Sequence, residues 1–208
     1  MDIIPNFVVF EGGDGSGTTT QLSMLTEHLR KSINPGFFPT FEPTNGEIGK
    51  IIRSALKKDL ILKPQTLAIL FAADRNEHLN GYGGILTHAR HGELVVSDRY
   101  VLSSLVYQGI ECGDELPAAL NSRFGVPELT FFFDIDPKVA VKRMSKRGSL
   151  EMYEYLDFQE LVRQKYISVV DDYKKSGARV EIIDSSKTIT EVADQVWSII
   201  SEMPIFNK

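Results

Sequence analysis

A glycine-rich stretch near the start of the chain could bind phosphate groups. Gly12 and Gly17 are separated by four residues, Thr18 and Thr19 follow them, and the apolar run 7–10 precedes them. Glycines allow backbone N–H groups to converge on an anion, and the N-terminus of a following helix adds a positive dipole end. The spacing therefore predicts a phosphate-binding loop between a buried strand and a helix. Thr18 stands where such loops ordinarily have a lysine.

Charged residues also follow apolar runs at three places in the chain. Asp14 follows the first run, Glu42 follows the second, and Asp98 and Arg99 follow the third. In open parallel sheets, ligands bind beyond the carboxyl ends of the strands. We therefore expect these side chains to share one edge of the sheet with the glycine-rich loop.

Strand-like and helix-like stretches alternate along the whole chain, without repeats or a low-complexity linker. This alternation predicts a single α/β domain over residues 1–208, with a parallel sheet flanked by helices. The strands are expected at residues 7–10, 37–41, 94–96, 129–135 and 180–183. The helices are expected from residue 18 to about residue 31, at 48–56, from Pro64 to a break at 81–84, at 85–90, from about residue 103, and at 139–147, 158–173 and 189–200.

The composition restricts the classes of function. The 208 residues are 42% hydrophobic, which is enough for a sizeable core, and the net charge of −5 argues against bulk nucleic-acid binding. No apolar run reaches membrane-spanning length, and the first residues lack the pattern of a secretory signal. The single cysteine, Cys112, provides no disulfide framework. We therefore expect a cytoplasmic enzyme that binds neither nucleic acid nor membrane. Four histidines without metal-ligand spacing are expected at the surface: His28, His78, His88 and His91.

Four blocks of the chain resemble the thymidylate kinase family, in that family's order. They are residues 10–17 with 19–21, Glu42-Pro43 with 48–53, residues 70–75, and residues 98–100 with 103–109. The third and fourth blocks are specific to these kinases, whereas the glycine-rich stretch alone is not. Weaker similarity at 127–137 and 143–148 extends the resemblance over nearly the whole chain. It implies a P-loop NTPase-type fold, with a five-stranded parallel sheet and a short lid at about residues 147–157.

The resemblance implies transfer of the γ-phosphoryl group from ATP to dTMP, with Mg²⁺ as cofactor and a homodimer as the assembly. Thr19 would offer its hydroxyl to Mg²⁺, Asp98 would hold the metal directly or through water, and Arg143 would flank adenine. The implied catalytic residues are Asp98, Arg99 and Arg147. The donor phosphates would be held by Gly12, Gly13, Asp14, Gly15, Ser16, Gly17, Thr18, Thr19 and Thr20.

On the acceptor side, the resemblance implies that Phe71 stacks on thymine and that Arg75 reaches an exocyclic oxygen. Tyr107 would pack beside the deoxyribose, Asp14 would take the sugar 3′-hydroxyl, and Arg99 would hold the phosphate. The complete set implied for dTMP is Asp14, Glu42, Pro43, Arg53, Phe71, Arg75, Arg99, Ser103, Ser104, Tyr107 and Gln108.

Several of these residues also fit a purely structural role. Phe71 could belong to the core, Arg53 could be a solvated helix residue, and Arg143 with Arg147 could form an ordinary charged helix face. These alternatives stay open at the level of the sequence.

The chain departs from the family pattern most clearly at Thr18. Removing one preorganised cationic contact can raise a barrier by about 3 kcal/mol, or about a hundredfold in rate. The lid stretch 149–159 contains no arginine or lysine, so Lys146 and Arg147 are the nearest replacements. Two smaller departures are Phe41, where many bacterial relatives have arginine, and the glycine-rich segment 81–84.

Two other functions therefore stand beside dTMP phosphorylation. The chain could be a kinase for another nucleoside monophosphate, or a non-catalytic nucleotide-binding protein on a kinase scaffold. Thr18 and the lid without arginine favour the non-catalytic alternative, whereas the otherwise full acceptor set favours an enzyme.

Overall fold

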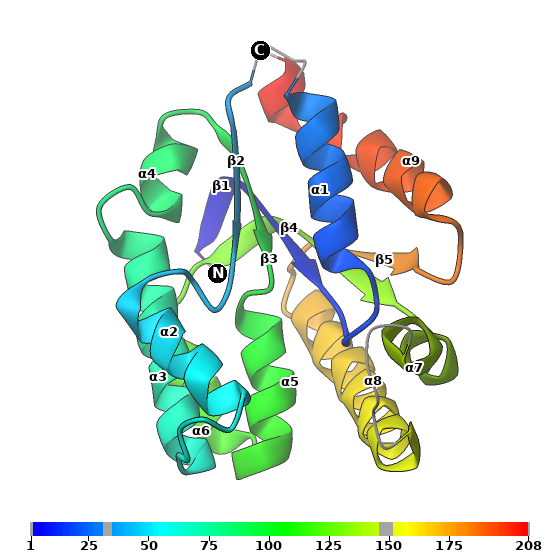
Figure 1. Cartoon of the computed structure of the whole chain (residues 1–208). Coiled ribbons are helices and arrows are strands. Elements are labelled where there is room, and N and C mark those ends of the chain that lie inside the picture. Colours follow the sequence, from blue (N-terminus) through cyan, green and yellow to red (C-terminus); the bar gives the residue numbers. More distant parts are fainter. Residues whose placement is uncertain (1, 31–34, 146–151, 208) are drawn as a thin grey trace.

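The computed structural model describes residues 2–30, 35–145 and 152–207. Five parallel strands form one sheet in the order β2-β3-β1-β4-β5, as Figure 1 shows. The strands are β1 (Ile3–Glu11), β2 (Phe37–Phe41), β3 (Leu94–Asp98), β4 (Val126–Asp134) and β5 (Val180–Asp184). The predicted five-stranded parallel sheet is confirmed.

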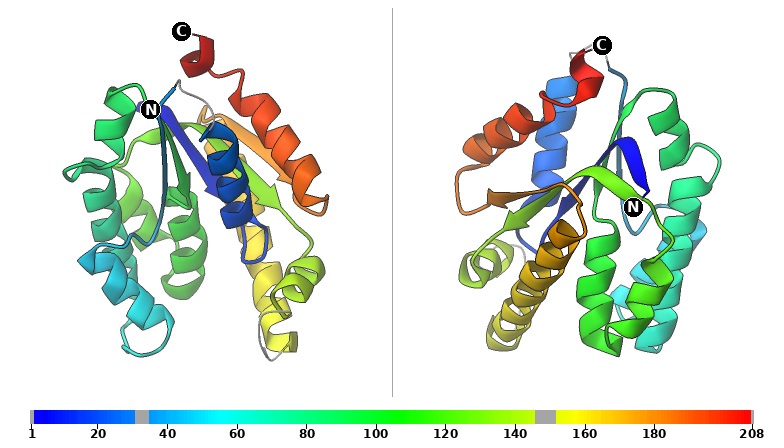
Figure 2. Two further views of the ribbon diagram at one scale, coloured as in Figure 1. Left: turned by 45° about the horizontal axis from the view of Figure 1, so that its top comes forward. Right: turned by 180° about the vertical axis from the view of Figure 1, so that it is seen from behind.

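Helices cover both faces of this sheet. They are α1 (Thr18–Leu29), α2 (Glu47–Leu56), α3 (Pro64–Asn80), α4 (Ile85–Arg90), α5 (Val101–Cys112), α6 (Glu115–Asn121), α7 (Pro137–Ser145), α8 (Met152–Lys175) and α9 (Ile189–Ile200), followed by a 3₁₀ turn at Pro204–Asn207. Figure 2 shows α1 and α9 on one side of the sheet and α5 and α8 on the other. None of the helices within the described ranges has the length and apolar character needed to cross a membrane.

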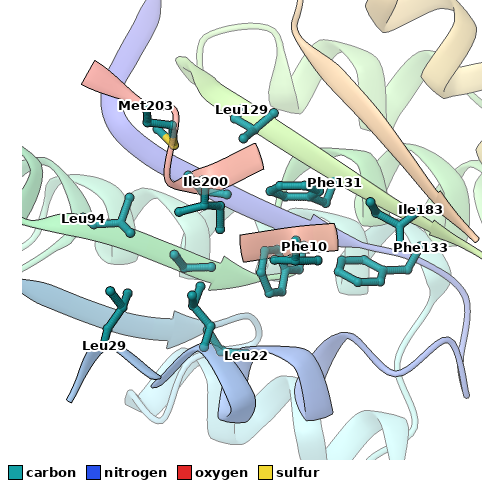
Figure 3. Packing of buried hydrophobic residues seen from close by; sticks show 14 of the residues in the cluster. Phe10, Leu22, Leu29, Leu94, Leu129, Phe131, Phe133, Ile183, Ile200 and Met203 are labelled. Carbon is teal, nitrogen blue, oxygen red and sulfur yellow. The ribbon is translucent and has the colours of Figure 1, made fainter. Parts of the chain in front are cut away.

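The two faces of the sheet bury different apolar clusters because alternate strand residues point to opposite sides. Phe10 and Phe131 belong to the cluster under α1 and α9, which Leu22 and Ile200 complete (Figure 3). The neighbouring strand residues Phe7, Val9 and Val95 belong to the cluster on the opposite face. Burial on both faces explains why the strands read as continuous apolar runs in the sequence.

Several elements differ from the sequence prediction. β1 begins at Ile3 rather than residue 7, and α8 begins at Met152, so residues 152–157 of the expected lid are helical. Helix α6 was not predicted; it has seven residues, of which the third is Pro117. The expected break at residues 81–84 is confirmed, because it separates α3 from α4. Arg147 and the rest of the lid, residues 146–151, lie outside the described residues.

The register of the sheet places the ends of β1, β2 and β3 together. Asp98, the last residue of β3, pairs with Phe10 of β1 on one side and with Phe41 of β2 on the other. The loops that contain Asp14, Glu42 and Arg99 therefore start at the same edge. In this sheet order the connection from β1 leads to β2 on one side of the sheet, and the connection from β3 leads to β4 on the other side. Parallel α/β sheets bind ligands at the point where the connections diverge in this way.

Candidate active site

The loop between β1 and α1 has the backbone of an anion-binding turn. Gly15 and Gly17 have φ angles of 79° and 94°, a left-handed conformation that favours glycine. Gly17 precedes the first turn of α1, which has neither a side-chain cap nor an acidic residue. The first N–H groups of this helix therefore lack the side-chain acceptor that helix starts ordinarily have, and they are available to bind an anion.

A cleft of about 860 Å³ opens beside this loop. Of the nine residues predicted to hold the donor phosphates, eight line it: Gly13, Asp14, Gly15, Ser16, Gly17, Thr18, Thr19 and Thr20. Gly12 lies beneath the loop instead, where a Cβ atom would come within 2.9 Å of the Phe133 carbonyl oxygen. Gly12 therefore allows the loop to pack against β4.

Thr19 and Asp98 form a pair that fits a magnesium ion. The Thr19 hydroxyl donates a hydrogen bond to Asp98 Oδ2 at 2.5 Å, and Asp98 Oδ1 is buried without a hydrogen-bond partner. Mg²⁺ typically takes one or two carboxylates, with waters and substrate phosphates as its other ligands. No group of three or more metal-ligating His, Cys, Asp or Glu residues occurs in the part of the chain that the structure describes, and a magnesium site of this kind does not need one.

Arg99 lies between the loop after β1 and helix α5. Its Nη2 donates to Asp14 Oδ1 at 2.7 Å, and its Nη1 donates to Ser103 Oγ at 3.2 Å. Burial lowers the pKa of Arg99, but its neighbouring tyrosines and carboxylates outweigh burial and raise the pKa well above its usual range. Arg99 is therefore a fixed cation at the edge of the sheet.

A second cavity, of about 220 Å³, lies beside the first. Ten of the eleven residues predicted for dTMP line it: Asp14, Glu42, Pro43, Phe71, Arg75, Arg99, Ser103, Ser104, Tyr107 and Gln108. Arg53 does not line the cavity; its Nη1 donates to the Pro43 carbonyl oxygen at 2.8 Å. In this structure Arg53 supports the loop that forms the cavity wall.

Arg75 is fully buried and held by a polar network. Its Nε and Nη2 donate to Glu42 Oε2 at 3.0 and 2.7 Å, and Nη2 also bonds the Tyr100 carbonyl and Ser104 Oγ. Its Nη1 donates to Asn121 Oδ1, which leaves one Nη1 hydrogen for a ligand. The guanidinium is thus fixed before any ligand binds.

The expectation that His78 lies at the surface is wrong. Its side chain is 7% exposed, Nδ1 lies 3.1 Å from Glu42 Oε1, and Nε2 lies 2.6 Å from Thr40 Oγ1. Burial is possible because both ring nitrogens have a polar partner. His78 therefore lies behind Glu42, on the side away from Arg75.

Asp14 accepts hydrogen bonds from two tyrosines as well as from Arg99. Tyr107 Oη lies 3.3 Å from Asp14 Oδ1, and Tyr155 Oη lies 3.1 Å from Asp14 Oδ2. Burial raises the pKa of Tyr107 to about 12 and also raises the pKa of Tyr155, so both remain donors at neutral pH. Tyr155 was not identified from the sequence, because its contact joins residues 141 positions apart.

Arg143 joins the phosphate-binding loop to the loop after β5. Its Nη2 donates to the Ser185 carbonyl oxygen at 2.9 Å, its Nη1 lies 3.5 Å from the Gly15 carbonyl oxygen, and the side chain lines the larger cleft. Lys187 lines the same cleft and was missed in the sequence. Among the residues that the structure describes, Arg99, Arg143 and Lys187 are the cations lining this cleft, and Thr18 adds none.

Comparison with known proteins identifies the same family over most of the chain. The family model described as thymidylate kinase matches residues 10–196. A Treponema pallidum protein that carries the provisional name of thymidylate kinase is 48% identical over 170 residues, with 81% of each chain covered. A relative from Pyrobaculum aerophilum, named a probable thymidylate kinase, is 37% identical over 96% of this chain and 98% of its own. The thymidylate kinase of Ligilactobacillus salivarius is 34% identical over 94% of this chain and 97% of its own.

Proposed function

Because this chain belongs to the thymidylate kinase family, we propose that it transfers the γ-phosphoryl group of ATP to dTMP and so forms dTDP and ADP. The observation that carries this proposal is that the two cavities share two residues. Asp14 and Arg99 line both the cleft at the glycine-rich loop and the smaller cavity beside it. A phosphoryl transferase needs its donor and acceptor sites to meet in this way, because the reaction depends on positioning and charge neutralisation.

On the donor side, the backbone N–H groups of residues 13–20 surround the phosphates of ATP. Arg143 and Ser185 also line the cleft, where they would flank the adenine. Magnesium, when bound, neutralises phosphate charge and orients the donor. Thr19 and Asp98 would hold the metal, and Asp98 Oδ1 is a buried oxygen without a hydrogen-bond partner.

On the acceptor side, Arg99 holds the phosphate of dTMP, and Asp14 accepts the sugar 3′-hydroxyl. Gln108 Oε1 is buried without a partner, and one Nη1 hydrogen of Arg75 is free. The residues lining the cavity thus offer one acceptor atom and one donor hydrogen, and the N3–H and O4 of thymine would be their complements. Phe71 lines the same cavity as a stacking surface.

A coupled ADP-release assay with ATP and Mg²⁺ tests this function. The acceptors compared are dTMP, dUMP, dCMP and dGMP, each over a range of concentrations. We expect dTMP to give a higher kcat/KM than dCMP, because cytosine lacks both the N3 hydrogen and the O4 oxygen. Uracil has both, so the comparison with dUMP measures the contribution of the 5-methyl group. Preference for dCMP or dGMP would assign a different monophosphate, and no turnover with any acceptor would contradict the kinase.

We also propose that the enzyme is a homodimer in the cytoplasm. Exposed apolar side chains gather on the packed helices α2 and α3 and on the segment between them: Ile51, Leu56, Leu60, Ile61 and Ile69. Exposed apolar side chains on neighbouring elements are a common feature of protein interfaces. Light scattering coupled to size-exclusion chromatography tests the dimer, and Ile69→Asp is expected to give a monomer. A mass of one chain for the unaltered protein would contradict the dimer.

A further inference from the structure

Glu11, the last residue of β1, is a fully buried acid that the proposed mechanism does not use. It immediately precedes the glycine-rich loop but lines neither cavity. A carboxylate away from water requires hydrogen-bond donors to offset the loss of hydration. Its partners therefore indicate what it does.

One carboxylate oxygen of Glu11 caps helix α5. Oε1 accepts hydrogen bonds from the backbone N–H groups of Tyr100 at 2.8 Å and Ser103 at 3.2 Å. Tyr100 is the N-cap residue of α5 and provides no side-chain cap of its own. Glu11 thus accepts hydrogen bonds from N–H groups at the start of α5, although it belongs to a different element. A Ser, Thr or Asp side chain at the helix start ordinarily has this role.

The other oxygen of Glu11 is linked to Arg99 through one hydroxyl group. Oε2 accepts from Ser103 Oγ at 2.6 Å and from Tyr166 Oη at 3.1 Å. Because Ser103 gives its proton to Glu11, its oxygen remains an acceptor for Arg99 Nη1, which lies 3.2 Å away. A continuous hydrogen-bond chain therefore runs from Arg99 through Ser103 to Glu11.

The backbone of Arg99 needs the same support. Its φ angle is 75°, in the left-handed region that is unfavourable for a residue with a side chain. Two hydrogen bonds to β1 enclose this turn: Arg99 N to the Phe10 carbonyl at 2.8 Å, and Tyr100 N to Glu11. Glu11 thus contacts both the backbone that turns at Arg99 and the serine that orients its guanidinium.

We propose that Glu11 is a positioning residue, which orients Arg99 toward the acceptor phosphate by capping α5 and accepting the Ser103 hydroxyl proton. This inference rests on the proposed function, in which Arg99 holds the acceptor. Glu11→Gln keeps the size and shape of the side chain but replaces one acceptor oxygen by an NH₂ donor. The four N–H and O–H groups that bond Glu11 would then meet an amide with a single acceptor oxygen, which cannot accept from all of them. A matched control is Glu128→Gln, because Glu128 Oε2 also accepts a backbone N–H, that of Asn6, but outside both cavities.

The first measurement uses the ligand-free protein and does not depend on the substrate. In protein labelled with ¹⁵N-arginine, the guanidinium signals of Arg99 are assigned by comparison with Arg99→Lys. We expect separate, slowly exchanging Nη signals in the unaltered protein and in Glu128→Gln. In Glu11→Gln we expect these signals to merge or broaden. Arg99 signals that Glu11→Gln leaves unchanged would overturn the proposal.

The second measurement is calorimetric titration with dTMP alone and with ATP alone. We expect Glu11→Gln to weaken dTMP binding by about tenfold and to change ATP binding by less than about twofold. A parallel loss of both affinities together with a fall in Tm would mean that Glu11 only stabilises the fold, and would overturn the proposal.

If Glu11→Gln does not fold, Ser103→Ala provides the same test of Arg99. It breaks the chain between Arg99 and Glu11 and leaves the Glu11 oxygen that accepts the two backbone N–H groups. The same merging of the Arg99 signals is expected, and its absence would overturn the proposal. Failure of the unaltered protein to phosphorylate dTMP would refute the proposed function, whereas the Arg99 signals would still test the role of Glu11 independently.

Discussion

Arg99 Nη2 lies 2.7 Å from Asp14 Oδ1, and this ion pair joins the loop after β3 to the loop after β1. Both residues line both cavities, so the pair marks the place where donor and acceptor would meet. A guanidinium can bond a carboxylate and a phosphate at once, because it has five N–H donors in a fixed plane. Arg99 can therefore keep Asp14 in place while it holds an incoming phosphate.

Arg99→Lys should weaken the acceptor site more than the donor site. Lysine keeps the charge but cannot bond Asp14, Ser103 and a phosphate in the same planar arrangement. We expect the KM for dTMP to rise by about ten- to a hundredfold, with a smaller change in the KM for ATP. Steady-state kinetics with each substrate varied in turn measures both. The control is Arg163→Lys, whose arginine pairs with Asp134 and lines neither cavity; equal effects of the two variants would contradict the role of Arg99.

Thr18→Lys should accelerate the reaction. Thr18 is the first residue of α1 and lines the donor cleft, where the described cations are Arg99, Arg143 and Lys187. An added ammonium group at this position would stabilise charge on the transferred phosphoryl group, so we expect kcat to rise by up to about a hundredfold. The control is Met24→Lys, which adds the same charge at an exposed position of the same helix, outside the cleft. An unchanged or lower kcat in Thr18→Lys would mean that another cation already performs this role.

Tyr155→Phe should strengthen dTMP binding. Tyr155 Oη bonds Asp14 Oδ2, an oxygen that the sugar 3′-hydroxyl would use, so the acceptor must compete with it. Removing one such hydrogen bond should lower the Kd for dTMP by about two- to tenfold. Calorimetry measures this Kd, and the exposed Tyr82 provides a matched Tyr→Phe control. Weaker binding by Tyr155→Phe would show instead that Tyr155 contacts the bound acceptor.

Glu11 should make the stability of the protein depend on pH. Burial raises the pKa of this carboxyl group above its ordinary value of 4.5. The folded state then binds more protons than the unfolded state, so the free energy of unfolding falls as pH rises from about 4.5 through the pKa of the folded state. Urea unfolding at several pH values should show a steeper fall in the unaltered protein than in Glu11→Gln, with Glu128→Gln as the reference for removal of a charge. Parallel pH profiles for all three proteins would contradict this prediction.

The sequence was sufficient to predict the sheet and the loop. Strands such as residues 94–98 are buried on both faces and therefore appear as apolar runs, and glycines at fixed spacing identify the phosphate-binding turn. Helix α6 escaped prediction because it is short and contains a proline at its third position. Its length gives the hydrophobic period too few turns to be recognised.

The support around the site could not be predicted, because it consists of contacts between distant parts of the chain. His78 bonds residues 36 and 38 positions away, and Glu11 bonds residues 89 to 155 positions away. Arg53 lies in a family block that implies a ligand contact, and the structure adds that its Nη1 bonds a nearby carbonyl group, a contact the motif did not indicate. Motifs thus identified part of the lining of both cavities, while the rest of the lining and the network behind it required the fold.

The most direct test of the proposed function is a product analysis in which dTDP and ADP are quantified from one reaction of the unaltered protein with ATP, Mg²⁺ and dTMP. We expect dTDP and ADP to accumulate in equal amounts. We expect Asp98→Asn, which removes the carboxylate charge of the proposed metal site, to lower the rate by about a hundredfold or more. ADP formed without dTDP, or no product at all from the unaltered protein, would contradict the assignment.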